Sequence, residues 1–251
     1  NGDMRFGVRN TRLGVKGFAA QSIKYAMQME LNSLGEFSVL DSYAALVLGD
    51  FEVSLGQQPY KFSTELSRGA GGYFANRSFV GKYISGYHGI DQGGNNVVSS
   101  IGARDIGAIV QYKSRWAIPM TFNVGVLNGA GINENAWNRH LNAIGRLDIG
   151  HEHAGPRFSA SYMGGKNALG DRMDMWGIEL SYKNGPVIVE SEFAKRYLDL
   201  GGDVDIMTAA VVNAMYFFRL PENIFAKTIV PQLRWDMGEN IKFVNLRRAM
   251  D

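Results

Sequence analysis

The chain has 251 residues, of which 45% are hydrophobic and 20% are charged, enough for one large domain. It contains no cysteine, which excludes disulfides, thiolate metal sites and cysteine nucleophiles. The net charge of +2 comes without a basic run, so nucleic-acid binding has no electrostatic support. No window approaches about 18 consecutive apolar residues, so the sequence predicts no transmembrane helix.

The clearest pattern lies between Ser22 and Asn32, where apolar and polar residues alternate without a break. Successive side chains of a strand point to opposite faces, so this segment has one apolar and one polar face. Its length matches the roughly 9–11 residues with which a tilted strand crosses a bilayer. In the segment before it, Met4–Gly17, the apolar residues change parity, which predicts a bulge near Arg9–Thr11.

Similar alternation recurs along the chain, and the dipeptides Gly49-Asp50 and Asn184-Gly185 predict tight turns between two of the segments. No segment of about ten or more residues carries a helical period, and the stretch from Gln57 to Asp105 is irregular. We count about twelve strands. After Ser22–Asn32, they are expected at 38–48, 51–56, 106–113, 120–126, 141–149, 157–162, 176–183, 187–193, 210–218 and 229–236, with another beginning at 242–248.

The connections alternate between short turns and longer loops, as in outer-membrane barrels, whose closed sheet leaves no unpaired edge in lipid. The polar faces mix both charges, as a wet lumen would. Aromatic residues lie near strand ends, as interfacial girdles do: Tyr25, Tyr112, Tyr162, Trp176, Tyr182 and Trp235. The sequence therefore predicts an all-β fold, a transmembrane antiparallel up-and-down β-barrel. A soluble β-sandwich or lipocalin-like barrel has the same period, with its apolar faces turned inward.

Six short motifs, in order from Arg9 to about Gly131, resemble the phosphate-selective porin O and P family of Gram-negative outer membranes. They are RNTRLGVKG at Arg9–Gly17, VLDSYAAL at Val39–Leu46, GQQPYKFSTELSR at Gly56–Arg68, NRSFV at Asn76–Val80, RDIGAIVQY at Arg104–Tyr112 and GVLNGAG at Gly125–Gly131. The resemblance implies a trimeric barrel of about sixteen strands that admits anions, with phosphate or polyphosphate as cargo. It also implies loops that fold inward and basic side chains along the pore.

Carried onto this chain, the resemblance makes residues 1–251 one transmembrane barrel domain with an inward-folding loop region at about 57–105, and Phe62–Arg77 lies near the constriction. About twelve strands are visible, and the intact protein would have up to sixteen, because the ending Arg247–Asp251 lacks the aromatic-terminated strand that such barrels share. The sequence starts at Asn1 without a signal peptide. If the protein is exported, we therefore expect this sequence to be its mature form.

Two sets of cations are candidates for the pore. The candidates for an anion-binding constriction are Arg68, Arg77, Lys82 and Arg104; the alternative is that they are solvated loop residues paired with Glu65 and Asp105. The predicted lumen-lining cations are Lys24, Arg146, Arg157 and Arg234. The same faces also hold many carboxylates, and Arg104-Asp105 stands where the family has two basic residues. This balance does not describe a strongly anion-selective tube.

Other chemistry has little support in the sequence. His151 and His153 share a face and could hold a metal, but they are expected to decorate a solvated turn. Glu190 and Glu192 could act as an acid–base pair, but charged lumen lining explains them as well. We expect no catalytic residues, no metal and no cofactor.

The sequence thus predicts a multi-pass porin of the cell outer membrane, with a water-filled channel for passive diffusion of small solutes, including anions such as phosphate. The expected partners are membrane lipid and lipopolysaccharide, small anionic or polar solutes and, as a homotrimer, further copies of the chain, with no nucleic acid. The alternatives are a structural or accessory subunit of a larger complex, or a barrel enzyme.

Overall fold

The computed structural model describes residues 10–32, 37–67, 78–84, 88–90, 96–98, 104–129, 131–133, 140–166, 170–199, 202, 204–221 and 227–239. Most of them belong to one 12-stranded sheet in which neighbouring strands run antiparallel. Its strands, in the order of the sheet, are β1 (Asn10–Ala20), β2 (Ile23–Asn32), β3 (Phe37–Leu48), β4 (Phe51–Pro59), β7 (Arg104–Lys113), β8 (Met120–Leu127), β9 (Asn142–Gly150), β10 (Gly155–Lys166), β11 (Arg172–Asn184), β12 (Val187–Asp199), β13 (Val204–Tyr216) and β16 (Gln232–Glu239).

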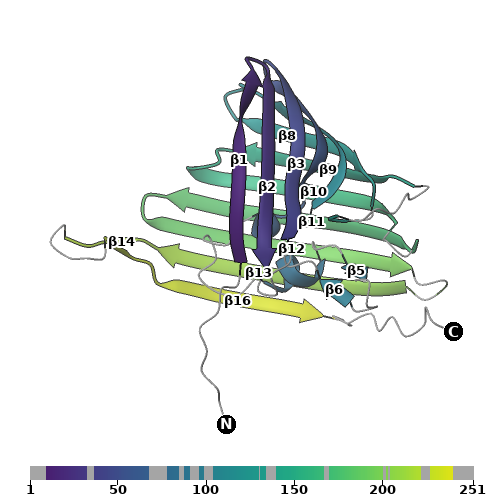
Figure 1. Cartoon of the computed structure of the whole chain (residues 1–251). Helices are drawn as coiled ribbons and strands as arrows, with labels where there is room; N and C mark the ends of the chain where they lie inside the picture. Colours follow the sequence, from purple (N-terminus) through teal and green to yellow (C-terminus); the bar gives the residue numbers. More distant parts are fainter. Residues whose placement is uncertain are drawn as a thin grey trace, which may run out of the picture.

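The order of the strands in the sheet follows their order in the chain, which confirms the predicted all-β up-and-down fold. The sheet is open, because within the described residues no ladder joins β1 to β16. It curls, so that β1, β2 and β3 cross in front of β11, β12 and β13 (Figure 1). Strands that twist in this way enclose a concave space between the two ends of the sheet.

Short elements lie between the strands of the sheet. The helical turn α1 (Thr64–Ser67), the π-helical turn η2 (Val80–Ile84) and the small hairpin of β5 (His88–Ile90) and β6 (Asn96–Val98) lie between β4 and β7. A second hairpin, of β14 (Phe218–Arg219) and β15 (Thr228–Ile229), lies between β13 and β16. None of the helices in the described ranges is long and apolar enough to cross a membrane.

The turns form where their dipeptides predict them. Leu48 pairs with Phe51 across a turn that contains Gly49, at a φ of 62°. Asn184 pairs with Val187 across a turn that contains Gly185, at a φ of 55°. Glycine is favoured at both positions because a side chain makes a positive φ costly.

Several expected boundaries differ from the structure; for example, β12 extends to Asp199, beyond the expected 187–193, and β13 begins at Val204, before the expected 210–218. Asn10 and Thr11 pair regularly with β2, and the irregularity of this ladder lies between Phe18 and Ala20, not near Arg9–Thr11. The irregular stretch also begins later than expected, because Gln57–Pro59 continue β4 and pair with Arg104–Ile106. The segments Met4–Arg9 and Lys242–Arg248 lie outside the described residues.

The two faces of the sheet separate apolar from polar side chains in the sense expected of a membrane barrel. On the outer face, Leu55, Val124 and Leu180 are 60, 63 and 60% exposed. On the inner face, Asn123, Arg146, Glu179, Glu192 and Asn213 are buried. A soluble sandwich would bury the apolar face instead, so the arrangement of the two faces resembles that of an outer-membrane barrel, in which the apolar face is outside.

Candidate functional site

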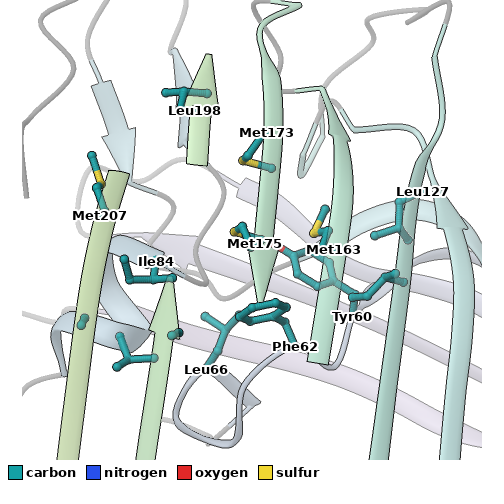
Figure 2. Packing of buried hydrophobic residues seen from close by; sticks show 14 of the residues in the cluster. Tyr60, Phe62, Leu66, Ile84, Leu127, Met163, Met173, Met175, Leu198 and Met207 are labelled. Carbon is teal, nitrogen blue, oxygen red and sulfur yellow. The ribbon is translucent and has the colours of Figure 1, made fainter. Parts of the chain in front are cut away.

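Residues 60–67 and 78–84, here named the inward segment, lie against the inner face of β8–β13. Phe79 is 38% exposed, whereas five of their apolar side chains, Tyr60, Phe62, Leu66, Val80 and Ile84, are each no more than 5% exposed. They contact an apolar patch of the sheet that includes Leu127, Met163, Met173, Met175, Leu198 and Met207 (Figure 2). The unbranched methionines fill irregular gaps between a coiled segment and a strand surface. This contact holds the inward segment against the wall of the concave space.

Arg146 of β9 is the polar centre of the anchorage. Its Nη1 donates to the backbone oxygen of Phe62 at 2.8 Å and to Oε1 of Glu179 at 2.6 Å. Its Nε donates to Oδ1 of Asp148 at 2.9 Å, and its Nη2 donates to Oγ1 of Thr64 at 3.2 Å. The Arg146 side chain is only 4% exposed. All three guanidinium nitrogens therefore bind protein acceptors, as a buried guanidinium requires.

The first turn of α1 is held by carboxylates of the sheet. The backbone N–H of Thr64 donates to Oε1 of Glu179 at 3.1 Å, and the hydroxyl of Thr64 also donates to Glu179. The backbone N–H of Glu65 donates to Oε2 of Glu192 at 3.2 Å. The first N–H groups of a helix have no acceptor within the helix, so the carboxylates of the sheet accept their hydrogen bonds.

The carboxylate of Glu65 joins the two parts of the inward segment. Its Oε1 accepts from the backbone N–H of Ser78 at 3.0 Å and from Nη2 of Arg234 at 3.4 Å. Asp236 accepts from the backbone N–H of Phe79 at 3.1 Å. The inward segment is thus bound to four strands, β9, β11, β12 and β16.

The predicted constriction cations are only partly within the described residues. Arg68 and Arg77 lie outside them, and for Lys82 the structure describes the backbone in η2 but not the side chain. Arg104 is the first residue of β7, and its Nε lies 2.7 Å from Oδ1 of Asp41. Glu65 and Asp105 had been the alternative partners of this set. Among the described residues, Glu65 pairs with Arg234, and Asp105 accepts from the backbone N–H of Gly129 at 2.7 Å.

The predicted lumen cations all form ion pairs. Lys24 lies 2.6 Å from Glu52, Arg157 lies 2.8 Å from Asp148, and Arg234 lies 3.3 Å from Asp236. Arg146 forms the anchor described above. The inner face therefore brings each of these cations to a carboxylate, so that little of the positive charge is left unbalanced.

Sequence reasoning missed two features of this face. Arg196 of β12 is 1% exposed and donates from Nη2 to Sδ of Met207 at 2.9 Å; its Nε and Nη1 have no hydrogen-bond partner in the described part of the chain. Its parity with Glu190 and Glu192 is the signal that would have placed it on the inner face. Thr64 was also missed, because nothing in its local sequence indicates a distant glutamate.

The other candidate chemistry finds no support in the geometry. His140, His151 and His153 are exposed. Within the described ranges, no group of three His, Cys, Asp or Glu side chains could hold a metal ion. Glu192 accepts from the backbone N–H of Glu65 in α1, and Glu190 lies 3.9 Å from Lys183.

The chain matches no protein-family model, and no curated protein matches it significantly. Among solved structures it is similar to OmpF of Salmonella typhi in complex with daunomycin, with a TM-score of 0.61 and 14% identity, over 95% of this chain and 74% of that chain. A mutant of the Rh. blastica porin matches with a TM-score of 0.38 and 12% identity, over 91% of this chain and 89% of that chain. The similarity to OmpF, together with the exposed apolar face, shows that this chain has the outer-membrane porin fold.

Proposed function

We propose that the chain forms a water-filled channel through the outer membrane, through which small polar solutes diffuse passively. The observation that carries this proposal is the inward segment, which is fixed by Arg146, Glu179 and Glu192 to the polar inner face of a sheet with an apolar exterior. A segment held against one wall narrows a channel while leaving the opposite wall free. In the intact barrel, residues 1–251 would be one domain, with the loop region at about 57–105 turned into the lumen.

The charges of the inner face favour a channel with weak charge preference. Arg12 lies 2.5 Å from Glu30, and Arg104 and Lys24 have carboxylate partners of their own. A paired cation presents little net potential to a passing anion, and a selective filter needs a ring or row of one sign. Phosphate, the cargo implied by the resemblance, would pass as one of many small solutes. A homotrimer in contact with membrane lipid, also implied by the resemblance, completes the proposal.

Planar-bilayer recording tests this proposal. Purified protein should produce stepwise conductance increments, and a salt gradient should give a reversal potential close to zero. Stable insertion without steps would contradict the channel. A large reversal potential of anionic sign, together with block by inorganic phosphate, would keep the channel but replace weak preference with phosphate selectivity.

A further inference from the structure

Lys195 of β12 lies on the outer face of the sheet. Its neighbours Ala194 and Arg196 are 0 and 1% exposed and lie on the inner face, so alternation turns Lys195 outward. In the ladders it stands directly opposite Trp176 of β11 and Thr208 of β13. On the same face of β12, towards the short turn, are Val189, Phe193 and, between them, Ser191, whose hydroxyl donates to the backbone oxygen of Leu180. A lysine therefore follows apolar residues on a surface that contacts lipid.

The position of Lys195 along the strand brings its ammonium group to the level of lipid headgroups. It is eight residues from Val187 at the short turn. With a rise of roughly 3.3 Å per residue and a tilt of about 45°, its Cα lies about 19 Å above that turn, and the apolar band is about 25 Å tall. A lysine stem spans the remaining distance when it extends towards the interface. Tyr162, Trp176 and Tyr197 lie at this end of the strands, as an aromatic girdle does.

No carboxylate in the described part of the chain forms an ion pair with Lys195 within 4 Å. The carboxylate nearest in the ladder, Asp174, accepts from the hydroxyl of Tyr162 at 2.6 Å and from Nε of Arg172 at 2.9 Å. Glu239 stands opposite Thr208 on the far side, two strands from Lys195, or about 10 Å. The ammonium of Lys195 is thus an uncompensated charge at the border of the apolar band. An anionic partner stabilises such a charge more strongly there than in water, because the dielectric constant is lower.

We propose that Lys195 binds the phosphate of a membrane lipid in the leaflet on the side of the long loops. The hydroxyl of Thr208 stands beside it as a second donor, and Arg172 lies nearer the strand end, on the headgroup side. The apolar residues below, Val189 and Phe193, accept the acyl chains. The lipid headgroup is the anion that the bilayer itself supplies at this depth. The inference rests on the membrane insertion in the proposed function, and it does not require that the channel conduct.

Lipid retention by purified protein in detergent tests the site, with bis-phosphorylated lipid A and its dephosphorylated form as probes in native mass spectrometry. The wild-type chain should retain the phosphorylated probe, and Lys195→Met should reduce this retention about ten-fold, the worth of one charge-assisted hydrogen bond. Lys113→Met, which removes a lysine of the inner face, is the matched control and should retain the probe as the wild type does. Methionine suits a surface in contact with lipid, and heat-modifiable electrophoretic mobility verifies that each variant has folded.

Equal retention by Lys195→Met and the wild type would overturn the inference. Displacement of the lipid probe by inorganic phosphate at the same concentration would also overturn it, since the site would then bind free anions. Bilayer recording of the same variants separates this inference from the channel proposal. Lys195→Met should conduct like the wild type. A wild-type chain that retains the lipid but never conducts would refute the channel and leave the lipid site intact.

Discussion

The inner wall formed by β9–β12 and the inner wall formed by β1–β4 carry the same kinds of charged residue but use them differently. On β9–β12, Arg146 and Glu179 are 4 and 10% exposed and bind backbone groups of the inward segment. On β2 and β4, Lys24 and Glu52 are 38 and 30% exposed and bind only each other among the hydrogen bonds of the described residues. The comparison teaches that what a charge does in such a lumen depends on whether a segment covers it.

The largest effect is expected from Arg146→Met. The substitution leaves Asp148 and Glu179 buried with less compensation, and breaking a buried ion pair from one side costs about 3–5 kcal/mol. The free energy of unfolding should fall by that amount, and single-channel conductance should rise and become noisier as the inward segment loses its anchor. Unchanged conductance would show that the segment does not narrow the channel.

A smaller effect is expected from Glu179→Gln. The amide keeps an acceptor for the backbone N–H of Thr64 but loses the charge that pairs with Arg146. The cost should be about 1.5–3 kcal/mol, the range for a hydrogen bond to a charged group. Hydrogen exchange at the amides of Thr64 and Glu65 should accelerate. Glu52→Gln on the opposite wall is the matched control and should leave this exchange unchanged. If exchange in Glu179→Gln is as slow as in the wild type, Glu179 does not cap α1.

Lys24→Met should scarcely affect stability, since exposed ion pairs contribute about 0–1 kcal/mol. Its effect should appear in permeation instead, because the substitution leaves Glu52 unbalanced on the open wall. The reversal potential in a salt gradient should shift towards cation preference. Lys183 lies near the short turn of β11. A shift of the same size in Lys183→Met would mean that charges of the open wall affect ion selectivity no more than other charges of the inner face.

The smallest effect is expected from salt alone. Raising the ionic strength from about 0.1 to 1 M shortens the Debye length from about 10 to 3 Å. The stability difference between Lys24→Met and the wild type should vanish, whereas that of Arg146→Met should persist, because its ion pairs are buried. Thermal unfolding at the two salt concentrations distinguishes these outcomes.

Local pattern predicted the face on which most residues lie. The alternation of 22–32 places Lys24 on the inner face and Tyr25 on the outer face of β2, and Asn184-Gly185 sets the turn between β11 and β12. Both results follow from short-range geometry, which the period of a strand and the conformation of glycine determine.

Local pattern could not predict which parts of the inner face would be covered. Thr64 and Phe62 are separated from Arg146 by 82 and 84 residues, and no periodicity encodes such a contact. Met173 and Met175 were not predicted either, because the strand was expected only at 176–183, after both of them. They are apolar because the inward segment packs on them. The rule that lumen-facing residues are polar therefore does not hold where a segment covers the inner face and forms a packed core.

The convergence on Glu65 has a consequence for biogenesis. Ser78 and Phe79 are held through Glu65 and Asp236, and the cation and carboxylate that complete this knot, Arg234 and Asp236, come from β16, the last strand of the described sheet. The two parts of the inward segment can therefore be fixed completely only after β16 has joined the sheet. If the inward segment narrows the channel, the channel would remain wider until β16 is in place.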